Sequence, residues 1–351
     1  MLERPSQLNS SQRFELEQVR FNSISFGIYL PTRIITNEEI EKWMVQTPNG
    51  RLITADEIKK RIGVERRYQA NPSQSALDLG IQASVATQNL EEIEAVITST
   101  SYPLGVNVSA EISISLQIKP DKKMDIHAAC SGFVRGLTYM KENESEFNGK
   151  KVLFVATELY SHTLEDLRDD GIKRDPSMAQ TIFSDGAVAI VFRFGQDLKV
   201  LAYKNEKIPE EYDHLIQMPI DRNLMTEPYI EEPVPSECST FQQNGPKVYE
   251  EMRTRIPDLN KNLIEESGLE PSDIKLVIPH QASGRMIDAI ASRMPEYKIY
   301  KDIRDGNFSS ASIPKAMIRA IKEGQIETGD KILLSGFGAG MYASSAIVEL
   351  G

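Results

Sequence analysis

Three segments of the chain place a chemically useful side chain among small residues next to a predicted strand or helix. The segment "DIHAACSGFVRGL" contains Cys130, one of only two cysteines in 351 residues, "VIPHQASGRMI" contains His280, and "RDGNFSSASIPKAM" contains Asn307. A cysteine can accept an acyl group, and a histidine just beyond a strand lies where open α/β sheets commonly place their sites. These three residues are therefore the first candidates for catalysis.

Cys130 has two opposing interpretations. It follows a predicted strand at 124–128 and precedes Ser131, Gly132 and the helical run "FVRGLTYM". At a helix N-terminus the unpaired N–H groups and the dipole favour a thiolate and can stabilise an oxyanion. Alternatively, Ala-Ala-Cys-Ser-Gly is simply a run of small residues that lets a helix pack closely on a sheet.

The other candidates also have structural explanations. A lone histidine such as His280 is more often a structural hydrogen-bonding residue, and Asn307 suits a turn because asparagine tolerates the left-handed region and caps helices. The glycine-rich "SGFGAGMYASSAIV", which includes Gly338 and Ala339, favours close approach of the backbone to a ligand. It lacks the G-x-G-x-x-G spacing and a Walker lysine, so a nucleotide site is not expected.

Composition narrows the class of protein. A net charge of −11 with 40% hydrophobic and 26% charged residues is typical of a soluble globular protein, and it argues against nucleic acid or an anionic membrane as partner. No apolar run approaches the ~18 residues of a membrane span, no signal peptide is visible, and two cysteines make no disulfide framework, so we expect a cytoplasmic protein. The histidines and cysteines lack metal-ligand spacing, and no metal is expected.

Strand-length apolar runs alternate with helical patterns, which indicates α/β packing with buried sheets. The best strands are expected at 94–101, 151–158, 187–194, 275–280 and 331–337, and helices at 73–90 and 286–294. Three pairs of segments also resemble each other at offsets of 177 to 181 residues, one of them "MDIHAACSG" with "KDIRDGNFS". Chance similarity between strands is the alternative, but the shared order predicts an internal duplication in which Cys130 and Asn307 hold equivalent positions.

The predicted organisation has three parts. Residues 1–20 form a polar extension, residues 21–195 a first half that carries the candidate cysteine, and residues 196–351 a second half that carries the histidine and the asparagine. Within the second half, residues 205–246 show little periodicity. They are expected to form a long loop, which is either a surface insertion or a contact for substrate or partner.

Together the motifs resemble those of the thiolase superfamily, and within it the β-ketoacyl-acyl-carrier-protein synthase III family. The resemblance runs from "FGIYLPTRIITNEEI" to the C-terminus and rests on "AACSGF", "FSDGAVA", "PHQAS", "DGNFSSASIP" and "GFGAGMYASSAIV". It implies a thiolase-like duplicated α/β core, built as a five-layered αβαβα sandwich and usually dimeric. We therefore expect a homodimer.

The resemblance also implies a reaction, which is decarboxylative Claisen condensation. An acyl thioester, carried by CoA or an acyl carrier protein, would load onto Cys130 and then react with a malonyl- or β-ketoacyl-carrier protein. His280 and Asn307 would stabilise the enolate formed as CO₂ leaves, and the backbone N–H groups of Cys130 and Ala339 would hold the tetrahedral oxyanion. This chemistry implies no metal and no other cofactor.

Several positions depart from the family pattern. Trp43, the only tryptophan, lies well upstream of "ADEIKKRIGV", where acyl-CoA-primed relatives usually carry a tryptophan, and Ser177 stands about where they carry an arginine. Phe308 replaces the family threonine beside Asn307, and small residues near Gly105 replace an aromatic gate. The missing tryptophan and arginine favour an acyl carrier protein or an unusual thioester as donor, and the departures together favour a divergent condensing enzyme of secondary metabolism.

Candidate substrate contacts and two alternative functions complete the predictions. The candidate contacts are Gly105, Phe308, Arg61 and Gly338. Arg61 belongs to the basic cluster "RIGVERRY", which is either a solvated surface or an anion contact. The alternatives are an acyltransferase that passes the Cys130 acyl group to a hydroxyl or amine without decarboxylation, and a non-catalytic partner in a heterodimer. The presence of both His280 and Asn307 favours condensation.

Overall fold

The computed structural model describes residues 16–47, 49–101, 106–161, 178–217, 229–230, 242–339 and 341–351. One sheet contains β1 (Leu16–Phe21), β2 (Ile24–Tyr29), β5 (Ala95–Ser99), β6 (Lys122–Ile126), β7 (Lys151–Glu158), β8 (Gly186–Arg193) and β11 (Tyr229–Ile230). A second contains β9 (Leu198–Lys207), β13 (Ile274–Pro279), β14 (Lys331–Gly338) and β15 (Tyr342–Leu350). Two small pairs join β3 (Arg33–Thr36) to β4 (Arg66–Gln69), and β10 (Ile216–Gln217) to β12 (Gln242–Gln243).

The strand order is β1-β2-β8-β7-β5-β6-β11 in the first sheet and β13-β14-β15-β9 in the second. In both sheets a parallel pair, β5–β7 or β13–β14, is followed by an antiparallel neighbour, β8 or β15. Strands β5, β7 and β14 are buried along almost their whole length because helices cover both faces of each sheet. The strands predicted from continuous apolar runs are confirmed.

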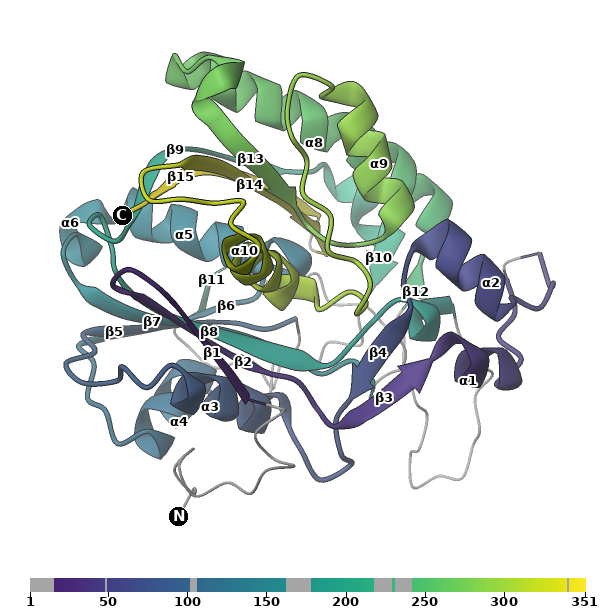
Figure 1. The fold of residues 1–351 in the computed structure, drawn as a ribbon, viewed down its shortest axis with the longest axis horizontal. Coiled ribbons are helices and arrows are strands. Elements are labelled where there is room, and N and C mark those ends of the chain that lie inside the picture. Colours follow the sequence, from purple (N-terminus) through teal and green to yellow (C-terminus); the bar gives the residue numbers. More distant parts are fainter. Residues whose placement is uncertain are drawn as a thin grey trace.

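The helices make three further layers (Figure 1). The longer ones are α3 (Ala76–Ala86), α4 (Val108–Ser115), α5 (Gly132–Glu142), α8 (Gly245–Ser267), α9 (Gly284–Arg293) and α10 (Ser312–Lys322). Helices α5 and α10 lie between the two sheets, α3 and α4 cover the outer face of the first sheet, and α8 and α9 cover that of the second. This arrangement is the predicted five-layered αβαβα sandwich, and its largest hydrophobic core joins the inner faces of both sheets to the middle layer.

Shorter helical segments connect these layers. They are α1 (Asn37–Lys42), α2 (Ala55–Glu57), a π-helix (Ile58–Ile62), α6 (Glu144–Phe147) and single turns at Met178–Thr181, Glu210–Leu215 and Pro271–Asp273. In the described ranges no helix is both long and apolar enough to cross a membrane.

The duplication is visible as two equivalent turns, but its register differs from the prediction. A 3₁₀ turn at Ala129–Ser131 precedes α5, and a 3₁₀ turn at Ser309–Ala311 precedes α10, so this turn and this helix of the second half each begin 180 residues after their counterparts. Cys130 therefore corresponds to Ser310, and the predicted equivalence with Asn307 is wrong. The "Asp-Ile" match misled because Ala129 follows Ile126 by three residues whereas Ser309 follows its matched isoleucine by six.

The first half also begins earlier than the sequence suggested. Residues 16–20, which were expected in the polar extension, belong to strand β1, which pairs antiparallel with β2 along the edge of the first sheet. Val19 and Phe21 pack against the main core, so the strand is partly buried despite its polar composition. Residues 1–15 lie outside the described part. Of the predicted loop 205–246, the structure describes only 205–217, 229–230 and 242–246.

Close packing of the middle layer predicts the effect of a small substitution. A Cβ atom at Gly136 of α5 would lie 2.4 Å from Cε2 of Phe154 on β7, so Gly136→Ala forces the helix away from the sheet. We expect the variant to lose roughly 1–3 kcal/mol of stability in urea unfolding. Gly245→Ala is the matched control, because no atom lies within 4 Å of its added Cβ. Equal midpoints for the two variants would contradict this packing.

Candidate active site

Cys130 lies in the strained turn that precedes α5. Ala129, the residue before it, has φ +41°, a left-handed conformation that alanine seldom adopts. The turn fits closely against β14, since a Cβ atom at Gly338 would lie 2.8 Å from the Cys130 backbone nitrogen and one at Gly336 would lie 2.7 Å from Ser131 Cα. The glycines of the predicted glycine-rich segment thus allow a strand of the second half to reach the cysteine backbone.

His280 follows β13 directly and is buried, with 6% of its surface exposed. Its backbone N–H donates to the carbonyl of Ser335 on β14 at 2.7 Å, and its Nδ1 atom has no hydrogen-bond partner among the residues that the structure describes. Burial lowers the pKa of His280 to about 3. The imidazole is therefore neutral at physiological pH, with one N–H to donate and one nitrogen to accept.

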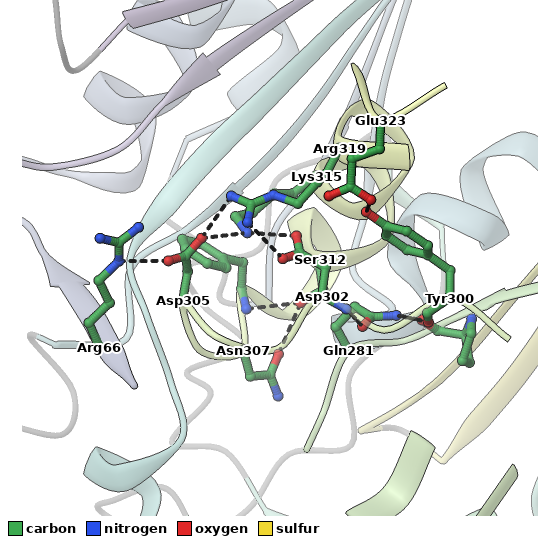
Figure 2. A network of polar contacts seen from close by, with 12 residues as sticks. Arg66, Gln281, Tyr300, Asp302, Asp305, Asn307, Ser312, Lys315, Arg319 and Glu323 are labelled. Carbon is green, nitrogen blue, oxygen red and sulfur yellow. Dashed lines mark hydrogen bonds and ion pairs between the residues drawn. The ribbon is translucent and has the colours of Figure 1, made fainter. Parts of the chain in front are cut away.

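Asn307 is oriented by its own loop. Its Oδ1 atom accepts hydrogen bonds from the Ser309 backbone N–H at 2.7 Å and from the Ser312 hydroxyl at 3.2 Å. The side-chain nitrogen consequently points away from the network formed by the rest of the loop (Figure 2). It also interacts with Cys130, whose pKa it lowers. The carboxamide is thus held as a hydrogen-bond donor.

A buried ionic network fixes the loop that carries Asn307 (Figure 2). Lys315 of α10 contacts Asp302 at 2.9 Å and Asp305 at 3.1 Å, and Arg319 contacts the same two carboxylates. Arg66 of β4 donates to Asp305 at 2.7 Å, which ties the first half of the chain to this loop. Burial alone would raise the pKa of Asp305, but Lys315 and Arg66 lower it to about 2.

Gln281 connects the histidine segment to this network. Its Oε1 atom accepts the Asp302 backbone N–H at 2.7 Å, and its Nε2 atom donates to the Pro279 carbonyl at 2.6 Å. The residues on either side of His280 are therefore held to the Asn307 loop and to β13. The structure relates the three candidates through shared elements: Cys130 and His280 both lie against β14, and Cys130 and Asn307 interact directly.

The environment of Cys130 opposes ionisation of the thiol. Burial raises the pKa of Cys130 to about 12, and the nearby carboxylate of Glu158 also raises it. Hydrogen bonding by Ser309, by the cysteine's own backbone N–H and by Asn307 acts in the other direction. The Ser309 hydroxyl lies 3.3 Å from Sγ. Formation of the thiolate therefore depends on hydrogen-bond donors around the sulfur.

Glu158 is a residue of the site that sequence reasoning missed. It ends β7 at the position equivalent to Gly338 at the end of β14, and it is fully buried. Its carboxylate accepts the Ser101 backbone N–H at 3.1 Å and the Ser310 N–H and hydroxyl at 3.1 and 2.5 Å. The sequence did contain a signal for this residue. An acidic residue ends the apolar run "KVLFVATE", whereas a glycine stands at the matching position of the second half.

The remaining predicted contacts have different surroundings. Phe308 is 2% exposed, its ring lies below the Lys315 ammonium at 5.2 Å, and a Cβ at Gly186 would lie 2.9 Å from it. Ala339 is buried in a small cluster with Ala129. Arg61 is mostly exposed and pairs with Glu57 at 3.5 Å. Contact of these residues and of Gly338 with substrate stays a prediction.

The last predictions concern residues outside the described ranges, the single tryptophan and the possibility of a metal site. Gly105 and Ser177 lie outside the described part of the chain, as does Cys238, the second of the two cysteines in the sequence. Trp43 is partly buried against a cluster that includes Ile40 and Ile58. Within the described ranges no group of three or more His, Cys, Asp or Glu side chains could hold a metal ion.

Comparisons with known proteins agree with this geometry. The family model for 3-oxoacyl-[acyl-carrier-protein (ACP)] synthase III matches residues 124–206, and the model for its C-terminal part matches residues 264–350. The β-ketoacyl-[acyl-carrier-protein] synthase III 1 of Halalkalibacterium halodurans is 30% identical over 344 residues, which cover 95% of this chain and 99% of that protein.

Two solved structures show the same likeness. The 3-oxoacyl-[acyl-carrier-protein] synthase III of Aquifex aeolicus has a TM-score of 0.74 at 26% identity, covering 92% of this chain and 98% of the other. The priming β-ketosynthase of a polyketide biosynthetic pathway has a TM-score of 0.74 at 25% identity, covering 93% and 94%.

A duplicated five-layered fold with a cysteine in the turn before a buried middle-layer helix defines the thiolase-fold condensing enzymes. Within that class, the chain belongs to the β-ketoacyl-acyl-carrier-protein synthase III family, as its motifs predicted. It is accordingly an enzyme of the acyltransferase class, of the condensing type.

The buried Glu158 carboxyl predicts a pH dependence of stability. Burial raises its folded-state pKa from 4.5 to about 7, so the folded protein retains a proton that the unfolded chain releases between these values. The contribution of Glu158 to the free energy of unfolding should therefore fall as the pH rises through this window. Above the window this contribution should stay constant. Glu158→Gln, which cannot ionise, should lose less stability than wild type between about pH 5 and about pH 8 in urea unfolding.

Glu144→Gln is the control for this measurement, because Glu144 is exposed and pairs with Lys141 on the surface. It should show the same difference between the two pH values as wild type. A Glu158→Gln variant that retains the whole wild-type decline would contradict the assignment of this pH dependence to Glu158.

Proposed function

We propose that Cys130 receives the acyl group and that His280 and Asn307 stabilise the enolate in a decarboxylative Claisen condensation. The observation that carries this proposal is the orientation of Asn307, whose oxygen is occupied by Ser309 and Ser312 so that its nitrogen is left to donate beside Cys130. The neutral state of His280 supports it as well, since a neutral imidazole still has one N–H to donate to the enolate oxygen.

In the loading step, the Cys130 thiolate attacks the carbonyl carbon of the acyl thioester. A new carbon–sulfur bond forms, and the carrier thiol leaves with its electron pair and takes up a proton. The oxyanion formed on the way would accept hydrogen bonds from the backbone N–H groups of Cys130 and Ala339. The strained turn and the close fit of Gly338 support this role, because they fix the orientation of the backbone around the sulfur.

In the condensation step, the malonyl carboxylate leaves as CO₂ and its bonding electrons form the enolate of the thioester. The enolate oxygen would accept hydrogen bonds from the imidazole N–H of His280 and the carboxamide N–H of Asn307. The enolate carbon then attacks the acyl–Cys130 carbonyl, and the cysteine sulfur leaves. No positive charge is required near the enolate, because oriented dipoles in a buried site are effective donors.

The donor, assembly and location are further parts of the proposal. We propose an acyl-carrier-protein thioester as the preferred acyl donor, a homodimer as the working form, and a cytoplasmic location. Partial burial of Trp43 supports the acyl-carrier-protein thioester as donor, because this tryptophan packs against a hydrophobic cluster of the protein. The departure at Phe308 supports a role in specialised rather than housekeeping biosynthesis.

The division of labour between the three residues predicts separable defects. His280→Ala and Asn307→Ala should each reduce CO₂ release from a malonyl thioester by roughly 10²–10³-fold, because one enolate donor is lost. Acylation of Cys130 should stay largely intact in His280→Ala and should fall much less than decarboxylation in Asn307→Ala, which also removes a donor to the sulfur. Intact-protein mass spectrometry reports acylation, and release of labelled CO₂ reports decarboxylation. Cys130→Ala is the control that should abolish the mass gain. Equal loss of both steps in the two variants would refute the assignment.

The preference for donor is tested with matched thioesters. In single-turnover loading, the same acyl group on an acyl carrier protein should acylate Cys130 faster than on CoA. A panel of acyl chains scored by acylated mass would also define the length and branching that the site accepts. Faster loading from CoA would overturn the proposed donor while leaving the proposed reaction standing.

A further inference from the structure

Three hydroxyl groups form a continuous chain that ends at the Cys130 sulfur. The Tyr160 hydroxyl donates to Ser101 Oγ at 3.0 Å, Ser101 Oγ lies 2.8 Å from Ser309 Oγ, and Ser309 Oγ lies 3.3 Å from Sγ of Cys130. Tyr160, Ser101 and Ser309 are buried. These hydroxyl groups come from both halves of the protein. Ser101 follows β5 and Tyr160 follows β7 in the first half, whereas Ser309 belongs to the second half.

The direction of the hydrogen bond at the sulfur is set by the ionised form of Cys130. Ser101 Oγ accepts the hydrogen of Tyr160, and the Ser101 hydroxyl faces two acceptors, Ser309 Oγ and the Glu158 carboxyl, which also accepts the Ser101 backbone N–H. A thiolate can only accept, so Ser309 directs its single hydrogen to the Cys130 sulfur once the thiol ionises. When Ser101 donates to Ser309, the aligned donors strengthen this last hydrogen bond.

Among the described residues of the site, neither Glu158 nor His280 provides a charge that favours the thiolate. The carboxyl of Glu158 faces Cys130 from β7, and its negative charge opposes ionisation. His280, beyond β13, is neutral because of its burial. A hydrogen bond that ends on an ionised group is about twice as strong as one between neutral groups, so the last hydroxyl gains most when the sulfur loses its proton.

We propose that Ser309 is a positioning residue that stabilises the Cys130 thiolate by hydrogen bonding, and that Ser101 and Tyr160 orient its hydroxyl for this task. The S–H proton passes to bulk water, and the sulfur keeps the electron pair with which it attacks. The catalytic value of this arrangement rests on the proposed function, but the ionisation itself can be measured without any acyl substrate.

The test is the rate of Cys130 alkylation by iodoacetamide as a function of pH, in a Cys238→Ser background so that one thiol reacts. The thiolate attacks the methylene carbon and iodide leaves, so at a pH below the thiol pKa the rate follows the thiolate fraction. Ser309→Ala should lower the rate at a fixed pH near 8 by about tenfold, corresponding to a thiol pKa about one unit higher. Ser101→Ala should lower it less, and Tyr160→Phe, which keeps the aromatic ring, least.

Ser84→Ala is the matched control, because Ser84 is a fully buried serine of α3 whose hydroxyl donates to the Gly80 carbonyl within its own helix. It should alkylate at the wild-type rate. An unchanged or faster rate in Ser309→Ala would overturn the inference, as it would show that Ser309 accepts the thiol hydrogen or does not affect it. Equal losses in all three chain variants would also overturn it, because a merely structural effect has no such gradient.

These outcomes are independent of those that test the proposed function. Graded alkylation without acylation by any thioester would leave the hydroxyl chain standing and refute the condensing role of Cys130. Normal acylation of Cys130 by a thioester, with no gradient in alkylation among the variants, would leave its condensing role standing and refute the hydroxyl chain.

Discussion

The site depends on the close contact between each of the two equivalent turns and a strand end from the opposite half of the chain. Ala129 and Ser309, at matched positions, both adopt left-handed backbone conformations, with φ +41° and +45°. The first turn packs against the end of β14 and the second against the end of β7, and the turns also contact each other. Strain of this kind persists only when the surroundings determine it, so neither half can form the site alone.

The two halves differ most where these strands end. β14 ends in Gly338, which leaves room for the Cys130 backbone, whereas β7 ends in Glu158, which fills the matching space and binds Ser310. One turn is thereby left open for chemistry while the other holds the loop of Asn307. Burial favours the neutral forms of Cys130, His280 and Glu158 alike, while the charges of the neighbouring ionic network neutralise one another. In the proposed reaction, the charge that develops would be stabilised by oriented dipoles.

Much of this fold was predictable from the sequence because its sheets are covered on both faces. Strands such as β7 and β14 are continuous apolar runs, and their resemblance at an offset of 180 reflects a real duplication. Strand β1 escaped notice because an edge strand with a polar face has no such signature. The register of the second turn was misjudged since loop length is not encoded in apolar periodicity, and Glu158 was missed because its partners are distant in sequence. The motifs identified Cys130, His280 and Asn307, but only the structure shows which atoms orient them.

Phe308 illustrates how one departure from a family motif can be absorbed by the protein itself. Its ring occupies space that exists because Gly186, at the start of β8, has no side chain, and it is capped by the ammonium of Lys315. An aromatic residue at 308 and a side chain at 186 are therefore mutually exclusive, although the two positions are far apart in the chain. In the ancestry of such a sequence, the order of substitutions matters: the small residue at 186 must be present before the phenylalanine at 308 can be fixed, and position 186 cannot regain a side chain while Phe308 remains.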